Sequence, residues 1–136
     1  MERTVVRLDA RKAAARVARW QKIADEAARQ CGRADLMTVE PIVKLESAVR
    51  REVGGRDVRI VLDEEEGSVR LRDVLRRDAS GYRFLIGPEG GVTREEVAVA
   101  TFAGFVGASL GPRTLRTETV APTLLAIVQH ALGDLG

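Results

Sequence analysis

Two loops of this 136-residue chain combine glycine, proline and charged residues in a way that is typical of ligand-binding loops. The first, IGPEGGVTREE, starts at Ile86, and the second, SLGPRTLRTE, starts at Ser109; each follows an apolar stretch. A glycine-rich loop ahead of a helix offers free backbone N–H groups and the positive end of the helix dipole, and both favour a phosphate. The sequence nevertheless contains neither the Gly-Lys-Ser/Thr ending of a P-loop nor the G-x-G-x-x-G dinucleotide fingerprint.

The charges around the first loop argue against an anionic ligand. Glu89, Glu95 and Glu96 surround the loop in sequence, and Arg94 is the one cation among them. Each near and poorly screened carboxylate repels an anion by roughly 1 kcal/mol or more. A neutral or cationic ligand therefore suits this loop better than a phosphate does.

The backbone of the first loop is suited to reading the edge of a flat, uncharged group. Pro88 fixes one dihedral angle, and Gly90 and Gly91 allow left-handed ones. Such a loop can present N–H and C=O groups to an adenine. S-adenosylmethionine carries an adenine and a sulfonium cation but no phosphate, so it fits the charge pattern. A tight turn that binds no ligand is the alternative.

Hydrophobic patterning predicts the elements that position these loops. Helices are predicted over residues 10–31, 43–51, 71–77, 94–103 and 119–132, and strands over 58–62, 82–86 and 105–110. Residues 38–42 are predicted to be extended, and residues 3–8 to be a short strand or an extended segment. Alternating strands and helices indicate one α/β domain with a mostly parallel sheet. Because ligands bind at the carboxyl ends of the strands in such sheets, the two loops should line one site.

Local signals predict several helix ends. Gly32 follows the first long helix, in the position that a helix C-terminus favours. Thr93 and Glu96 have the spacing of a capping box. With Thr119 as the cap of the last helix, Pro122 would lie in the first turn, where its missing N–H does no harm.

Two of the predicted helices carry broad apolar faces. In the first, a stripe at steps of three and four residues includes Trp20, which is therefore assigned to the core rather than to stacking on a nucleic-acid base. The members of this stripe are Val17, Trp20, Ile23, Ala24, Ala27 and Cys31. The last helix is apolar nearly all round, which predicts burial on more than one side and, near a chain terminus, a subunit interface. A central core helix in a monomer is the alternative.

Composition excludes several classes of protein. With 45% hydrophobic and 31% charged residues, the chain has the composition of a soluble globular protein, with the cytosol as the default compartment. The single cysteine, Cys31, and the single histidine, His130, are too few for a disulfide framework or a Cys/His metal cluster. No run reaches the ~20 apolar residues of a membrane span, and the first residues contain no apolar signal core.

Charge is spread unevenly along the chain. Residues 1–33 contain nine Arg or Lys and four acidic residues, a net charge of +5, whereas the whole chain has +2. This basic segment favours contact with a polyanion such as RNA, and a solvated helix face is the alternative. The acidic run from Asp63 to Glu66 is either a metal or ribose site or a solvated turn.

Three blocks of the sequence, in order, resemble the RsmE-type ribosomal RNA methyltransferase family. They are RWQKIADEAARQCGR at 19–33, IGPEGGVTREEV at 86–97 and SLGPRTLRTET at 109–119. The family's patterns for them are R-W-x-K-I-x-x-E-A-x-x-Q-S-x-R, I-G-P-E-G-G-[hydrophobic]-[Ser/Thr]-x-x-E and L-G-x-x-[Ile/Val]-L-R-x-E-T-A. Departures occur at Cys31, Val92, Thr114 and Val120, and Pro122 is unusual, but none removes a glycine or a charge of the main blocks.

This resemblance implies a fold and an activity that the residue patterns alone do not give. The fold is of the SPOUT class, a mostly parallel sheet flanked by helices with a carboxy-terminal trefoil knot that binds S-adenosylmethionine. The protein would act as a cytoplasmic homodimer, without a metal, and methylate N3 of a uridine in 16S ribosomal RNA. Methylation of a ribose 2′-hydroxyl, or a non-catalytic RNA-binding or dimerisation module of the same fold, are the alternatives.

The resemblance also bears on domain organisation. It assigns residues 1–136 to the SPOUT methyltransferase domain. Family members usually carry a PUA-like RNA-binding domain ahead of it, which this sequence lacks. The chain is therefore expected to be a carboxy-terminal fragment or a stand-alone domain, with cofactor binding retained and RNA selection and turnover weakened.

The site residues are carried over from the matching blocks. The cofactor-binding candidates are Leu62, Ile86, Gly87, Pro88, Glu89, Gly90, Gly91, Leu110, Gly111, Leu115, Arg116 and Thr117. The catalytic candidates are Arg116, which would stabilise the uracil anion or hold a phosphate, and Glu118, which would orient groups or accept the imide proton. A structural ion pair of Arg116 with Glu118 or Glu89, and a purely orienting role for Glu118, are the alternatives.

Overall fold

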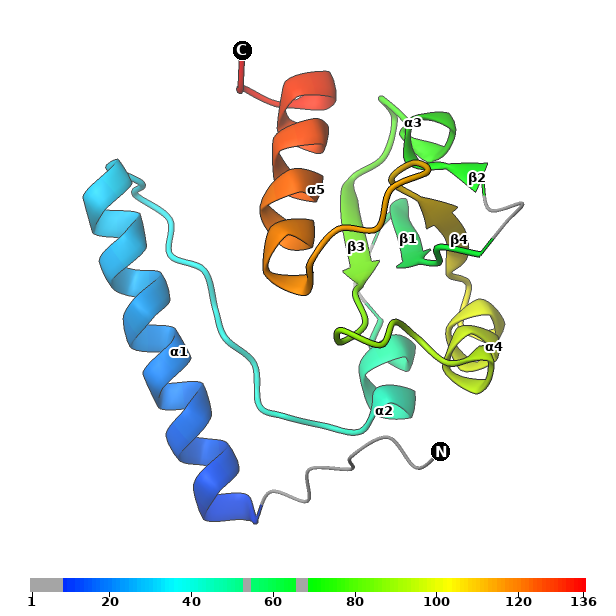
Figure 1. Cartoon of the computed structure of the whole chain (residues 1–136). Coiled ribbons are helices and arrows are strands. Elements are labelled where there is room, and N and C mark those ends of the chain that lie inside the picture. Colours follow the sequence, from blue (N-terminus) through cyan, green and yellow to red (C-terminus); the bar gives the residue numbers. More distant parts are fainter. Residues whose placement is uncertain (1–8, 53–54, 66–68) are drawn as a thin grey trace. The chain divides into compact units, whose positions relative to one another are not determined.

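The chain forms two compact units, residues 1–44 and 45–136. The computed structural model describes residues 9–52, 55–65 and 69–136, and the predicted extended segment at 3–8 lies outside them. The first unit holds one long helix and an extended segment, and the second holds a sheet with its helices (Figure 1). Within the described residues, no helix is long and apolar enough to cross a membrane.

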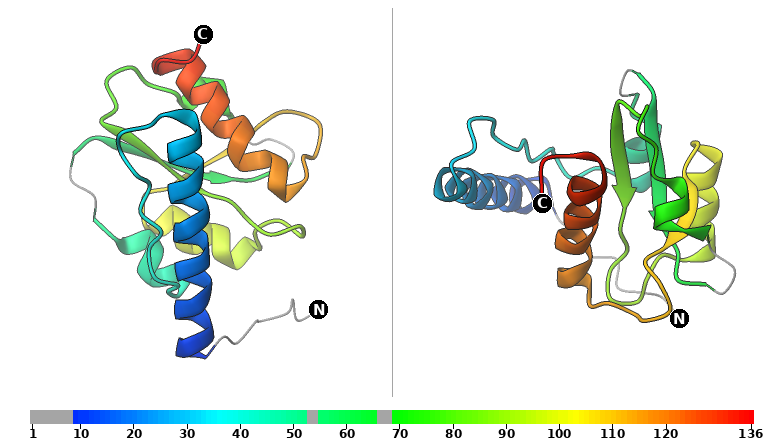
Figure 2. Two further views of the ribbon diagram at one scale, coloured as in Figure 1. Left: turned by 90° about the vertical axis from the view of Figure 1, so that its left-hand side faces the viewer. Right: turned by 90° about the horizontal axis from the view of Figure 1, so that it is seen from above.

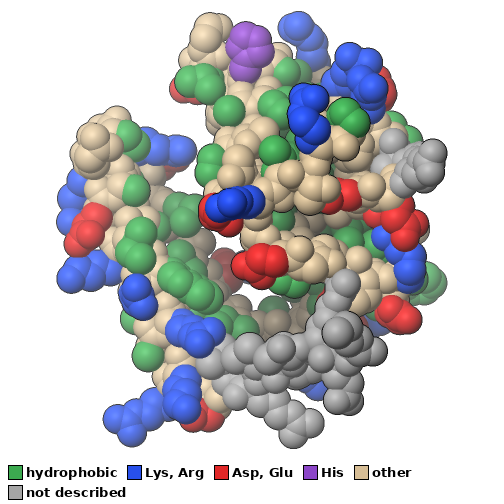
Figure 3. All heavy atoms as spheres, in the orientation of Figure 1, with side chains coloured by type: hydrophobic (Ala, Val, Ile, Leu, Met, Phe, Trp, Pro, Cys, Tyr) green, Lys and Arg blue, Asp and Glu red, His purple; other side chains and the backbone are tan. Residues whose placement is uncertain are grey.

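The helix of the first unit, α1, spans Ala10–Cys31, as predicted. Asp9 caps its start, because the side chain accepts a hydrogen bond of 2.8 Å from the backbone N–H of Lys12. Gly32 ends it in the left-handed conformation, with φ of 77°, and donates its N–H to the last turn. Basic side chains follow the length of α1 in Figure 3.

A single glutamine holds the segment that follows α1 along the helix. The amide of Gln21 donates to the carbonyl of Met37 at 2.8 Å, and its oxygen accepts the N–H of Val39 at 2.8 Å. Residues 38–42 form neither helix nor strand, and their extended conformation stays a prediction.

The predicted core stripe of α1 was wrong for its largest members. Trp20 is 45% exposed and Ile23 is 54% exposed, whereas Ala28, which lies outside the stripe, is the buried residue of this helix. The unit consists of one helix and one extended segment, which offer too little surface to cover an apolar stripe.

The second unit is built on a four-stranded parallel sheet with the order β2-β4-β1-β3. Its strands are β1 (Asp57–Leu62), β2 (Val69–Arg70), β3 (Gly81–Leu85) and β4 (Val106–Ser109). Its helices are α2 (Leu45–Arg50), α3 (Leu71–Val74), α4 (Arg94–Phe102) and α5 (Thr117–Leu132). The predicted α/β class with a parallel sheet is therefore confirmed.

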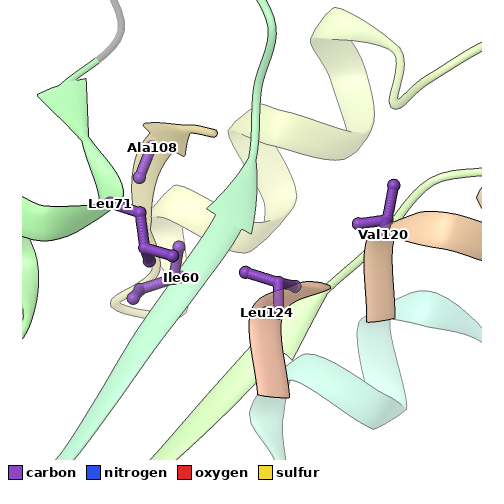
Figure 4. Close-up of a cluster of buried hydrophobic side chains, with 5 residues drawn as sticks. All are labelled: Ile60, Leu71, Ala108, Val120 and Leu124. Carbon is purple, nitrogen blue, oxygen red and sulfur yellow. The ribbon is translucent and has the colours of Figure 1, made fainter. Parts of the chain in front are cut away.

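Alternation along β1 divides the core between the two faces of the sheet. Ile60 and Val61 are both fully buried, and neighbouring side chains of a strand point to opposite faces. Ile60 packs in one cluster with residues of α3, β4 and α5, drawn in Figure 4, and Val61 packs in a second cluster with residues of α2 and α4. Accordingly, α5 covers one face of the sheet and α4 the other (Figure 2). This three-layer arrangement leaves the carboxyl ends of the strands available for a site.

Several predicted bounds changed by a few residues. The helices predicted at 43–51 and 71–77 are α2 and α3, which are both shorter. The chain leaves α3 at Leu75, which adopts an extended conformation with φ of −71° and ψ of 133°. Strand β2 was not predicted, because two residues are too few to show a periodic pattern.

The start of α5 was predicted wrongly. Arg116 occupies the cap position and its carbonyl accepts the N–H of Thr119 at 2.9 Å, so the helix begins at Thr117. Pro122 consequently lies inside the helix and not in its first turn. Burial of Val120 and Leu124 against the sheet, rather than the preference of proline for a first turn, determines where this helix runs.

Candidate functional site

The first glycine-proline loop folds tightly between β3 and α4. The N–H of Gly91 donates to the carbonyl of Pro88 at 2.7 Å, and Gly91 has a positive φ of 72°. A Cβ atom on Gly87 would lie 2.7 Å from both the carbonyl carbon of Gly91 and the backbone nitrogen of Val92. Glycine is therefore required at position 87, because the two ends of the loop approach each other through their backbones.

The exit of this loop is the predicted capping box. The backbone N–H of Glu96 donates to Thr93 Oγ1 at 3.1 Å, and the N–H of Thr93 donates to Glu96 Oε2 at 2.8 Å. Glu96 is thus occupied by the helix cap. Glu89, at the exposed tip of the loop, is the carboxylate that would meet a ligand there.

An ion-pair cluster ties the start of α4 to the end of β1. The guanidinium of Arg94 donates to both carboxylate oxygens of Asp63, at 2.7 and 3.1 Å, and its Nε lies 3.0 Å from Glu65 Oε1. Asp63 is buried, with 9% of its surface exposed. The hydrogen bond from Arg94 is the main reason that the pKa of Asp63 lies below its usual value, with a smaller contribution from the N–H of Glu65.

This cluster corrects the prediction for the first residue of the acidic run after β1. Asp63 is buried and bonded to Arg94 through both of its oxygens, whereas Glu64 and Glu65 are exposed, as expected for a solvated turn. Among the described residues, no group of three or more His, Cys, Asp or Glu side chains could hold a metal ion. Glu66, the last member of the run, lies outside those residues.

The second loop leads from β4 into α5. Gly111 has a φ of 132°, which other residues rarely adopt, and Leu110 and Leu115 on either side pack against the core. Arg116 and Glu118 are exposed at the start of α5. Within the part of the chain that the structure describes, Arg116 forms no ion pair, so the alternative of a pair with Glu118 or Glu89 is not observed.

The apolar candidates from three strand ends meet on one side of the sheet. Leu62 follows the buried part of β1, Ile86 follows β3, and Leu110 and Leu115 follow β4. All four pack against the cluster around Ile60. Because β1 lies between β3 and β4, the two loops reach the same edge with Leu62 between them.

Most of the remaining cofactor-binding candidates of the first loop are more exposed to solvent than the apolar ones. Pro88, Glu89, Gly90 and Gly91 are exposed, and Gly87 is half-buried. Thr117, at the first position of α5, is also half-buried. Arg94 was not predicted to pair with Asp63. The sequence signal for this pair would have been a cation directly after Thr93, the helix cap.

A parallel sheet covered by helices on both faces, with two glycine-proline loops at its carboxyl edge, is an arrangement typical of ligand-binding α/β domains. The family model described as RNA methyltransferase domain matches residues 1–129, and the chain belongs to this family. The predicted family resemblance is therefore confirmed.

Relatives and solved structures agree with this assignment. The chain is 37% identical over 113 residues to ribosomal RNA small subunit methyltransferase E of Mycobacterium bovis, which covers 81% of this chain and 43% of the relative. It is 34% identical over 134 residues to the protein of the same name from Bacillus subtilis, which covers 94% of this chain and 52% of the relative. The chain thus spans about half the length of these curated relatives.

Two similar structures contain S-adenosylmethionine. A protein from Legionella pneumophila, 36% identical, superposes with a TM-score of 0.86 over 99% of this chain and 54% of its own. The ribosomal RNA small subunit methyltransferase E of Neisseria gonorrhoeae, 34% identical, superposes with a TM-score of 0.85 over 100% of this chain and 54% of its own. Both were solved with that cofactor bound.

Proposed function

We propose that this chain is the catalytic part of a methyltransferase that uses S-adenosylmethionine to methylate N3 of a uridine in 16S ribosomal RNA. The observation that carries the proposal is the meeting of the two family loops at one edge of the sheet, with their apolar residues on a common cluster. The names of the relatives and the cofactor in the two similar structures support it. Such an enzyme would work in the bacterial cytoplasm, where ribosomes are assembled.

The residues present fit this cofactor. The backbone at 87–91 and 110–117 would hold the adenosine, because Gly87 lets the loop close on itself and Gly111 supplies a conformation that other residues rarely adopt. Leu62 and Ile86 would offer an apolar surface to the adenine ring. The exposed carboxylate of Glu89 suits a cation better than a phosphate. When bound, S-adenosylmethionine supplies the methyl group.

Arg116 and Glu118 would prepare the base. The uracil imide is a poor nucleophile until it loses its proton, so the site must accept that proton and stabilise the resulting anion. Glu118 would accept the proton or orient the base, and the guanidinium of Arg116 would stabilise the anion. The positive end of the α5 dipole lies where both residues sit and also favours a negative charge.

The order of strands supports a trefoil knot in the carboxy-terminal part. The last strand, β4, is inserted between β2 and β1, although both precede it in the chain. The chain then returns over the sheet, where Val120 and Leu124 of α5 pack on the cluster around Ile60. We infer that the segment from β4 through α5 is threaded through the preceding loop.

The surface of α5 supports a homodimer. Val120 and Leu124 are buried, but Leu125 on the same helix is 60% exposed, and Ala121 and Ala126 beside it are exposed as well. An apolar helix face left uncovered by its own unit is the kind of surface that a second copy covers. We infer that two chains pair through this face.

Cofactor binding and the position of the methyl group test the proposal. Isothermal titration with S-adenosylmethionine should show saturable binding. Mass spectrometry of 16S ribosomal RNA from small subunits incubated with the chain and cofactor should then locate the methyl group on a uracil N3. A methylated ribose would point to the alternative RNA target. An absence of binding at millimolar cofactor would point to a non-catalytic RNA-binding or dimerisation module.

A further inference from the structure

The charged residues at the carboxyl edge of the sheet form two groups. In the first group, Asp63, Glu64 and Glu65 follow β1, where the N–H of Asp63 donates to the carbonyl of Ala108 in β4 at 3.0 Å, and Glu89 follows β3. Arg94 is the cation beside the acids that follow β1, and it is held by Asp63 and Glu65. This first group therefore has a negative balance.

The second group, on the segments that follow β2 and β4, is mostly basic. Four arginines lie there: Arg70 at the end of β2, Arg72 in α3, Arg113 in the second loop and Arg116 at the cap of α5. All four are exposed. Within the described residues, Arg70, Arg113 and Arg116 have no ion-pair partner.

Strand pairing and core packing bring the segments that carry these arginines together. Arg70 pairs in register with Ser109, the residue directly before the second loop. Leu71, between the first two arginines, is buried in the same cluster against which Leu110 and Leu115 pack. Residues of α3 and of the second loop thus flank a common support, although more than 40 positions separate Arg70 from Arg113 in the sequence.

Two acidic residues reduce the charge of this surface without cancelling it. Asp73 lies 4.0 Å from Arg72, with 73% and 59% of the arginine and aspartate side chains exposed. Glu118 is exposed on α5 near Arg116. Arg70 and Arg113 are the members that keep their full charge available.

We propose that Arg70, Arg72, Arg113 and Arg116 form a phosphate-binding surface that receives the backbone of the RNA substrate beside the cofactor loops. Exposed guanidinium groups bind phosphate oxygens through two parallel hydrogen bonds. This inference rests on the proposed function, and it adds Arg70, Arg72 and Arg113 as residues that position the RNA.

The salt dependence of RNA binding tests the surface. Binding of a fluorescein-labelled single-stranded RNA of mixed sequence is measured by anisotropy over a series of KCl concentrations. Each phosphate contact to a single strand contributes about 0.7 to the slope of log K against log salt. The double variant Arg70→Ala/Arg113→Ala should therefore bind more weakly and lose about 1.4 of that slope.

Matched variants separate charge from other effects. Arg56→Ala removes an exposed arginine directly before β1, at the opposite edge of the sheet, and should leave the slope unchanged. Arg70→Lys/Arg113→Lys keeps the charges and should keep most of the slope. A double alanine variant with the slope of Arg56→Ala would overturn the proposal. So would an equal loss of binding at every salt concentration.

Cofactor titration keeps this inference distinct from the proposed function. The single variant Arg70→Ala, which lies outside both cofactor loops, should bind S-adenosylmethionine as the unmodified chain does. If the unmodified chain bound RNA with the expected arginine dependence but bound no cofactor, the surface would stand and the methyltransferase proposal would fail. If it bound cofactor but the arginines made no difference to RNA binding, the surface would fail alone. Arginine-dependent binding to phosphatidylserine vesicles, without such dependence for RNA, would assign the surface to a membrane and overturn the RNA proposal.

Discussion

Asp63 at the end of β1 and Arg94 at the start of α4 are joined by two hydrogen bonds of 2.7 and 3.1 Å across 31 positions of the sequence. Arg94 directly follows Thr93, the cap on which the first loop ends. The pair therefore attaches the exit of that loop to β1, one of the two inner strands of the sheet. The buried carboxylate of Asp63 thus fixes where the first loop ends relative to the sheet.

Asp63→Asn should make the free energy of unfolding of the chain less dependent on pH in the acidic range. The pKa of Asp63 is lowered in the folded chain, mainly by its hydrogen bond from Arg94. The ionised carboxylate therefore contributes its full stabilisation at pH values above its unfolded pKa of about 3.9. This stabilisation is lost as the pH falls toward and through the lower pKa of the folded chain. Urea denaturation at several pH values should show the unmodified chain more stable than the variant near neutrality. The difference should shrink in acid below about pH 4.

Asp134→Asn is the control for this experiment, because Asp134 is exposed. It should leave both the stability and its pH dependence unchanged. A constant difference between Asp63→Asn and the unmodified chain down to the lowest pH would show that the pair does not act through the ionised carboxylate.

Gly87→Ala should disrupt the first loop. The added Cβ would lie 2.7 Å from two backbone atoms of the same loop, which cannot move aside as a flexible side chain can. Crowding of this kind costs typically 1–3 kcal/mol. Denaturation should show this loss, and calorimetry should show weaker binding of S-adenosylmethionine. Gly81→Ala is the matched control, since a Cβ there meets no atom within 4 Å. Equal behaviour of the two variants would contradict the close approach.

Arg116→Ala and Glu118→Gln should each slow methyl transfer while leaving cofactor affinity nearly unchanged. Loss of a proton acceptor or of a group that stabilises the anion typically lowers the rate by about 100-fold or more. The rate is measured with tritiated S-adenosylmethionine and small subunits, and the affinity by calorimetry. Thr114→Ala changes an exposed residue of the same loop and should keep the rate. Rates near that of the unmodified chain would remove Arg116 or Glu118 from the chemistry.

Leu125→Asp should separate the proposed dimer. The side chain is 60% exposed in one chain, so the change leaves the core intact but places a charge in the predicted interface. Sedimentation should show a species near the monomer mass of 14.8 kDa for this variant and twice that mass for the unmodified chain. Phe102→Asp, at an exposed apolar residue of α4, should leave the dimer intact. A monomeric unmodified chain at high concentration would contradict the dimer itself.

Elements with strong local signals could be predicted from the sequence. The capping box of Thr93 and Glu96 and the left-handed Gly32 depend on neighbouring residues alone, and both formed as expected. The apolar run that became β1 is long enough to show its pattern. Of the loop glycines, Gly91 and Gly111 have positive φ values that few other residues adopt, whereas Gly90 does not take the left-handed conformation that it allows.

Features that depend on distant contacts could not be predicted in the same way. The ion pair of Asp63 with Arg94 requires knowing that β1 and α4 meet. Strand β2 exists because β4 offers it an edge, and its own two residues carry no signal. The exposure of Trp20 reflects how little surface its unit provides, which periodicity does not reveal.

Pro122 weakens the connection between the first turn of α5 and the rest of the helix. Proline has no N–H, so the carbonyl of Glu118 receives no hydrogen bond from the residue four positions on. The first turn is therefore joined to the rest of the helix by one hydrogen bond fewer, which lowers the free energy at which this turn opens. Arg116 and Glu118 lie at the cap and in the first turn, so RNA that binds to them can stabilise the closed, helical form of this turn. Amide hydrogen exchange at the start of α5 should accordingly slow when RNA binds, while exchange beyond Leu124 stays as it was.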